Sequence, residues 1–215
     1  GELVTDLVLP SDTTEINNYA FSECNSLTSI TIPDGVTNIG DSAFYNCRSL
    51  TSIAIPNSVT SIGAGAFSGC IRLKSVPIPD SITRIYDGAF SGCGLTSLTI
   101  PNSITSIGDY VFSGCNNLVS ITISDGVASI GEWTFNNCRS LTSVTIPDSI
   151  TSIGTNAFSG CIRLKSVTIP NSVTYIGSFA FEGCRSLTDL TISDGVTKIG
   201  EKMFSGCRGL VNVTI

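Results

Sequence analysis

The chain has 215 residues, of which 41% are hydrophobic and 13% charged, and its formal net charge is −6. The apolar fraction suffices for a continuous core, and no apolar run approaches the ~18 residues of a membrane span, which argues against membrane insertion. A negative net charge offers no basic field for phosphates, so nucleic acid is not expected as a partner.

A nine-fold repeat organises the whole sequence. The pattern Phe-x-x-Cys recurs at steps of 23 residues, with one step of 22, and places cysteines at Cys24, Cys47, Cys70, Cys93, Cys115, Cys138, Cys161, Cys184 and Cys207. A period of this length predicts a solenoid whose units stack on one another. We therefore expect residues 1–215 to form one domain of about nine units. Because the chain opens at Gly and stops inside a repeat, we expect it to be a fragment of a longer protein.

Each unit is predicted to hold two short strands and a helical turn, as the unit from Cys24 to Cys47 illustrates. Residues 28–32 alternate in polarity and are β-branched, which predicts a strand that ends at a Pro-Asp-Gly turn. Residues 36–39 form a second extended segment. Asp41 then stands where it could cap a helical turn over residues 42–46. Strands of adjacent units are expected to pair in parallel, roughly 4.8 Å apart, in a right-handed coil.

Two irregularities fall close together. Pro77 takes a strand position that is Thr in seven other units, and the connection after Cys93 lacks one residue. Since proline cannot donate to a strand ladder, we expect the solenoid to be distorted between Pro77 and Leu95.

The unit consensus, LxxIxIPxxVxxIGxxAFxxC, closely resembles the leucine-rich repeats of BspA-like bacterial surface proteins, and the match covers essentially the whole chain. The resemblance implies an α/β repeat fold, namely a leucine-rich-repeat solenoid with parallel strands. It also implies a cell-surface or secreted location and a role in adhesion. The corresponding function is a non-enzymatic module that engages a protein partner, such as a host or matrix protein.

The cysteines are not expected to do chemistry. The chain has no histidine and no Cys-x-x-Cys pair, so the ligand spacing of a zinc site and the usual base of a thiol nucleophile are both missing. We predict a ladder of reduced, buried thiols, and neither a cofactor nor a metal. Aspartates recur in the turn that ends the first strand, interleaved with asparagines, and there turn chemistry is favoured over calcium binding.

Serine and threonine dominate the outward strand positions. Such a polar array suggests an alternative function in glycan or ice binding, although Ala54 and Pro77 interrupt it. The simpler interpretation is that β-branched polar residues suit a solvated sheet.

Variation among the units is concentrated two residues before each Phe. Large aromatic residues occupy that position at Tyr110, Trp133 and Phe179, with Asn156 in the unit between the last two. Exposed aromatic side chains often anchor binding, whereas the alternative is that the rings pack over their own solenoid. We take these four residues as candidate partner-binding residues. A second column, Arg48, Arg139, Arg185 and Arg208, directly follows cysteine, and decoration of a solvated loop is favoured over an anion site as its role.

Overall fold

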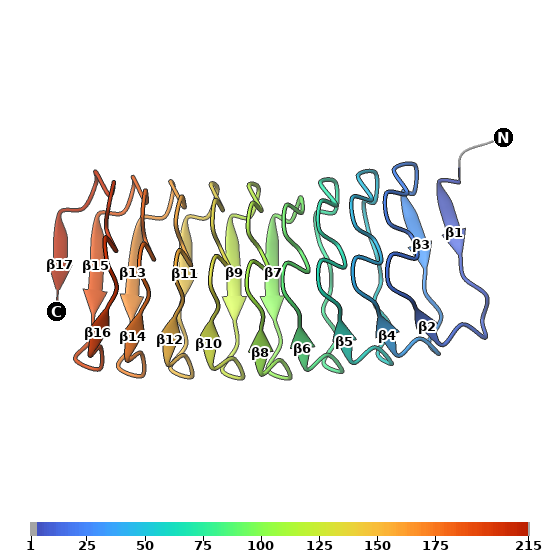
Figure 1. Cartoon of the computed structure of the whole chain (residues 1–215), viewed down its shortest axis with the longest axis horizontal. Helices are drawn as coiled ribbons and strands as arrows, with labels where there is room; N and C mark the ends of the chain where they lie inside the picture. The colour runs from blue at the N-terminus through green and yellow to red at the C-terminus, as the bar shows by residue number, and fades with distance from the viewer. Residues whose placement is uncertain (1–3, 215) are drawn as a thin grey trace.

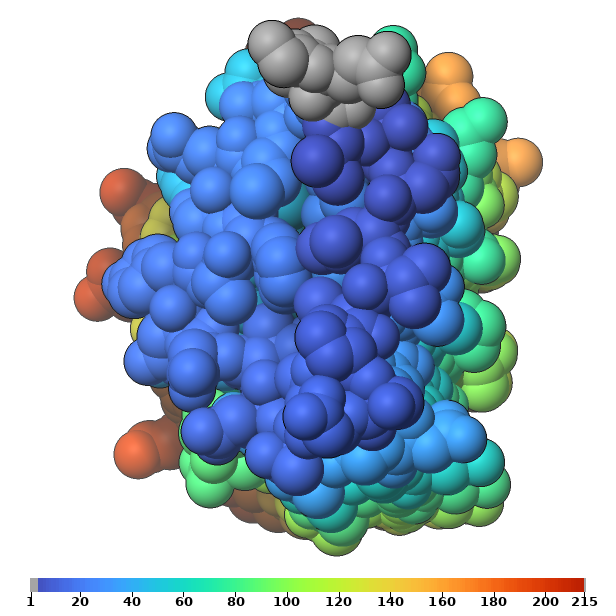
Figure 2. All heavy atoms as spheres, turned by 90° about the vertical axis from the view of Figure 1, so that its right-hand side faces the viewer, coloured from blue at the N-terminus to red at the C-terminus, as the bar shows by residue number. Residues whose placement is uncertain are grey.

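The computed structural model describes residues 4–214 as a solenoid of stacked coils (Figure 1). Most coils contain a first short strand, a turn, a second and usually shorter strand, and a series of turns that leads to the cysteine loop. Seen from the N-terminal end, the later coils lie behind the first coil and show at its edges (Figure 2). The strands therefore form two rows that run along the length of the solenoid.

The first row is divided into three parallel sheets, which contain β1 and β3, then β7, β9 and β11, then β13, β15 and β17. Its strands are β1 (Asp6–Val8), β3 (Ser29–Thr31), β7 (Ser97–Ile100), β9 (Ser120–Ile123), β11 (Ser143–Thr145), β13 (Ser166–Ile169), β15 (Asp189–Ile192) and β17 (Asn212–Thr214).

The second row is divided into a five-stranded and a four-stranded parallel sheet. The five-stranded sheet contains β2 (Glu15–Ile16), β4 (Asn38–Ile39), β5 (Ser61–Ile62), β6 (Arg84–Ile85) and β8 (Ser106–Ile107). The four-stranded sheet contains β10 (Ser129–Ile130), β12 (Ser152–Ile153), β14 (Tyr175–Ile176) and β16 (Lys198–Ile199).

The strand register places each side chain beside its equivalent in the next coil. Leu98 pairs with Ile121 and Ile100 with Ile123, and all four are buried. The repeated phenylalanines form a continuous stack from Phe21 to Phe204, with neighbouring ring centroids 5.2–6.3 Å apart. The buried apolar residues of all coils make one core cluster. Parallel pairing in register thus turns a repeated sequence position into a column of like contacts.

The expectation of helical turns is wrong, because no helix occurs among residues 4–214. In the segment after the second strand, Ser42 and Asn46 have positive φ angles of 51° and 55°. Residues in this left-handed region cannot continue a right-handed helix. With no helix present, no described segment could cross a membrane as a long apolar helix.

Hydrogen bonds between coils replace the helix. The Phe44 amide donates to the Ala66 carbonyl in the next coil at 2.7 Å, whereas the neighbouring Tyr45 amide donates within its own coil to Ser42 at 3.0 Å. Asp41, which we expected to cap a helix, instead accepts a hydrogen bond from the Ala64 amide at 2.7 Å through its carboxylate. Asp41 therefore links two adjacent coils and does not cap a helix.

The expected interruption near Pro77 is present, and it begins one coil earlier than predicted. In the first row no strand forms over residues 52–55 or 75–78, between β3 and β7. Amides in this row donate to the preceding coil, as Ser29 does to Thr5 at 3.2 Å. Pro77 has no amide hydrogen, so it cannot donate the equivalent hydrogen bond to a carbonyl of residues 52–55 in the preceding coil. The second row stays paired through this region, from β4 to β8.

Candidate functional site

The four candidate residues belong to a column that we call the variable column, which contains the residue two positions before each repeated Phe. All nine members have positive φ angles, between 51° and 61°. They are Tyr19, Ser42, Gly65, Gly88, Tyr110, Trp133, Asn156, Phe179 and Lys202.

The backbone of the variable column is fixed by hydrogen bonds on both sides. The Trp133 amide donates to the Thr155 carbonyl in the next coil at 2.9 Å, and the Trp133 carbonyl accepts from Asn136 at 3.0 Å. The same conformation occurs at Gly65 and Gly88, so the fold requires this backbone geometry but does not require an aromatic side chain at the position. Large side chains in this region are strained by roughly 1–2 kcal/mol each, and glycine is not.

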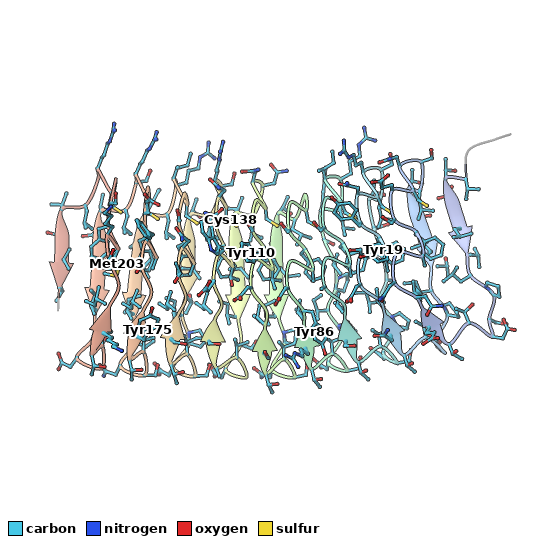
Figure 3. All side chains as sticks on the ribbon, viewed as in Figure 1. Tyr19, Tyr86, Tyr110, Cys138, Tyr175 and Met203 are labelled. Carbon is cyan, nitrogen blue, oxygen red and sulfur yellow. The ribbon has the colours of Figure 1, made fainter. Side chains whose placement is uncertain are left out.

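Tyr110 and Trp133 form a stacked pair on the surface. Their ring centroids are 6.0 Å apart and the ring planes differ by 7°. The Tyr110 side chain is 46% exposed and Trp133 is half-buried. Figure 3 shows Tyr110 midway between the upper and lower rims of the solenoid, at about the height of Tyr19 in the same column.

The remaining candidates lie in the next two coils. Asn156 is buried, with 7% of its surface exposed, and the neighbouring Phe179 is half-buried. The Lys202 ammonium lies 5.8 Å from the centre of the Phe179 ring, within the range of a cation–π contact. The structure thus places the four sequence-predicted residues in consecutive coils, with Asn156 between an aromatic pair and a Phe–Lys pair.

The repeat pattern matches one family along almost the whole chain. The model of the BspA type leucine rich repeat region matches residues 2–119 and 105–215, in six copies. The chain belongs to this family. Proteins of this family are repeat proteins, a class that generally provides surfaces for binding other proteins.

Solved structures of bacterial leucine-rich repeat proteins share the fold of this BspA-type chain. The protein from T. pallidum is 32% identical over 74% of this chain and 77% of its own, with a TM-score of 0.70. A protein from Bacteroides ovatus is 29% identical over 98% and 78%, with a TM-score of 0.58. A leucine rich cell surface protein from Faecalibacterium prausnitzii is 32% identical over 98% and 79%, with a TM-score of 0.51. No curated protein matches the sequence.

A second surface feature of the BspA-type chain was not foreseen from the sequence. The first strand row is hollowed where it is interrupted, and the hollow has a volume of about 520 Å³. Its polar lining includes Asp80, Ser97, Thr99 and Thr122, with Pro77 at the interruption. Pro77 was the sequence signal for a distortion, and the hollow lies between the strandless residues 75–78 and the neighbouring strands β7 and β9.

The cysteine ladder is buried in the middle of the BspA-type solenoid and open at its ends. All nine thiols are free, but Cys24 is exposed and Cys207 half-buried, which corrects the expectation that all would be buried. Burial raises the pKa of Cys115 and Cys161 to about 12, so these thiols stay protonated at neutral pH. Each thiol from Cys47 onward donates to the Phe carbonyl of the coil before, as Cys47 does to Phe21 at 3.0 Å.

The described part of the chain contains no cluster of side chains that could ligate a metal ion. Residues 4–214 contain no group of three or more His, Cys, Asp or Glu side chains that could hold a metal ion. Several carboxylates have structural contacts instead, as Asp109 does with the Glu132 amide of the next coil at 2.7 Å.

Proposed function

We propose that this BspA-type chain is a non-enzymatic binding module that engages a protein partner through the variable column, centred on Tyr110, Trp133 and Phe179. Asn156 forms the buried floor between the two outer pairs. We further propose a cell-surface or secreted location and a role in adhesion to a host or matrix protein. The similar F. prausnitzii protein is itself described as a cell surface protein, which supports this location.

One observation carries the proposal. Three bulky aromatic side chains stand at backbone positions whose left-handed conformation favours glycine, although the same chain uses glycine there in two other coils. Stability does not explain the rings, because they add strain and remain partly exposed. Strain at a surface position is often retained for function, and rigid aromatic side chains are frequent binding anchors.

The test compares two glycine substitutions in the same column. Trp133→Gly relieves backbone strain while it removes the ring, so we expect a melting temperature within a few degrees of the parent. Binding to an immobilised panel of collagens and laminin should fall tenfold or more, as for a hot-spot residue. The matched control is Tyr19→Gly, which makes the same backbone change at a residue that is 65% exposed in the first coil, and should bind like the parent.

Two results would contradict the proposal. One is saturable binding to a matrix protein that survives Trp133→Gly unchanged. The other is a loss of binding in Trp133→Gly that is matched by a large drop in melting temperature, since the ring would then be part of the fold.

The hollow in the first strand row supports an alternative, glycan binding. Its hydroxyl-rich lining offers donors and acceptors in a concave surface, whereas the division of the row into three sheets argues against the flat array that ice would need. Thr122→Ala should then abolish signals on a glycan array that Trp133→Gly leaves intact. Equal signals from both variants and the parent would exclude this hollow.

A further inference from the structure

Basic side chains gather along one rim of the solenoid, in the loop that follows each cysteine. Six of the eleven lysines and arginines lie there, one or two residues after a cysteine, and all six are exposed. They are Arg48, Arg72, Arg139, Arg163, Arg185 and Arg208. Figure 3 shows nitrogen-tipped side chains projecting from the upper rim, in a group near each end. We call this edge the arginine rim.

The opposite rim has the opposite charge. It is formed by the turns that follow the first strand row, whose acidic members are Asp12, Asp34, Asp80, Asp125, Asp148 and Asp194. None of these turns contains a lysine or arginine. Although the net charge is −6, the positive and negative side chains are separated across the solenoid. The edge that carries the arginines therefore has a local positive potential.

The arginine rim is densest toward the C-terminal end. Arg139, Arg163, Arg185 and Arg208 come from four consecutive coils, so one guanidinium recurs with each coil. At roughly 4.8 Å per coil, the four span about 14 Å in a row along the solenoid axis. Arg163 stands two residues after its cysteine, whereas the other three arginines follow theirs directly, so the sequence column alone omits Arg163.

A hollow lies between two of these arginines. Arg139 and Arg185 line a surface depression of about 300 Å³ that is formed by three consecutive coils. Gly160 and Gly183 leave its floor without side chains, and Ile162, which is 36% exposed, provides an apolar surface. The depression therefore combines an apolar floor with a guanidinium on each side.

These guanidinium groups have no internal counter-charge. Within residues 4–214 no salt bridge joins them to a carboxylate, and Glu182, the nearest acid in the chain before Arg185, makes none. Arg84, by contrast, lies over the Tyr86 ring at 4.6 Å, away from this rim. Exposed guanidinium groups without a partner are available to bind carboxylate or sulfate groups in a bidentate manner.

We propose that the arginine rim binds a linear anionic polysaccharide, laid along the solenoid axis across Arg139, Arg163, Arg185 and Arg208. A sugar ring presents an apolar face with charged substituents at its edge, which fits an apolar floor between two guanidinium groups. A single straight row suits one extended chain. The net charge of −6 opposes the extended contact that a nucleic-acid duplex makes, and an acidic peptide lacks a ring to fill the hollow. This surface is separate from the variable column.

The test uses heparin as the probe and measures its dissociation constant at several salt concentrations. We expect Arg139→Ala/Arg185→Ala to weaken heparin binding tenfold or more, and to reduce the slope of log K against log salt by about one to two. Arg84→Ala is a control that removes a positive charge on another face, and should bind heparin like the parent. Polyglutamate and single-stranded DNA of equal charge should bind more weakly than heparin.

The outcomes separate this proposal from non-specific attraction. Absence of heparin binding at low salt would overturn it, as would an equal effect of Arg84→Ala and the double variant. Polyglutamate or single-stranded DNA that binds as tightly as heparin would show that charge alone is recognised and would equally overturn the assignment of a polysaccharide. Trp133→Gly should leave heparin binding unchanged.

Discussion

The side chain of each repeated cysteine has two structural roles. It is small enough to lie beneath the phenylalanine stack, and its thiol donates a hydrogen bond to a phenylalanine carbonyl of the preceding coil, as Cys138 does to Phe112 at 3.1 Å. An aliphatic residue of similar size could fill the space but would not donate. The bond therefore gives a physical reason for cysteine at this position, without any redox role.

Thiol reactivity should follow position in the stack. We expect Cys24 and Cys207 to react rapidly with a thiol reagent in the native state, because Cys24 is exposed and Cys207 half-buried. A hydrogen bond with Cys184 also lowers the pKa of Cys207. Native labelling should give two fast equivalents, and denatured protein should give nine. The double variant Cys24→Ser/Cys207→Ser should lose the fast phase, and fast labelling that persists in it would show that the interior thiols are accessible.

Among the elements, the first strand row is interrupted over two coils next to Pro77. Pro77 removes an amide donor, and the structure has no strand on either side of the missing bond, over residues 52–55 and 75–78. The second row continues unbroken beside it, from β4 to β8, because its hydrogen bonds do not involve the proline. Each row of strands thus depends on its own ladder, and a defect stays within one row.

Restoring the donor should restore the ladder. Pro77→Thr gives this coil the residue of seven other units, and we expect a gain of about 0.5–1.5 kcal/mol in the free energy of unfolding. Urea denaturation provides the measurement, and the converse variant Thr122→Pro, in the paired strand β9, should lose stability. A parent-like denaturation midpoint for Pro77→Thr would mean that proline is not the cause of the interruption.

In the whole molecule, stability comes from repetition of the same contacts between coils. The phenylalanine rings, the thiols and the aliphatic strand positions form parallel columns within one core. Phe112 is fully buried between Phe90 and Phe135, so each coil depends on both neighbours. A change that acts on several coils at once should therefore affect the entire solenoid.

Alkaline pH is such a change. Burial raises the pKa of Cys47, Cys115 and Cys161 from 9.0 to about 12, so the folded state holds protons that the unfolded state releases above pH 9. Their contribution to stability is complete below pH 9 and is lost as the pH rises toward 12. The urea midpoint should fall between pH 8 and pH 10.5, and less steeply in Cys115→Ala. An unchanged midpoint over this range would contradict the raised pKa values.

The sequence by itself determined the stack and its core. A pattern of 23 residues that returns eight times can bury its apolar side chains only by pairing each unit with its neighbour in register, so the parallel strands, the phenylalanine and cysteine columns and the family were all predictable. The four candidate residues could likewise be placed in one column, because their spacing from the phenylalanine is constant.

Only the tertiary structure decided the backbone between Gly40 and Cys47 and its equivalents. Serine, tyrosine, tryptophan and phenylalanine have no intrinsic preference for positive φ, so a helical turn was the natural prediction. The left-handed conformation is instead imposed by amides that bond to the next coil, as Ser42 does to Ala64 at 2.8 Å. The same holds for the hollow at Pro77. It arises from contacts between coils, which no single unit of the sequence contains.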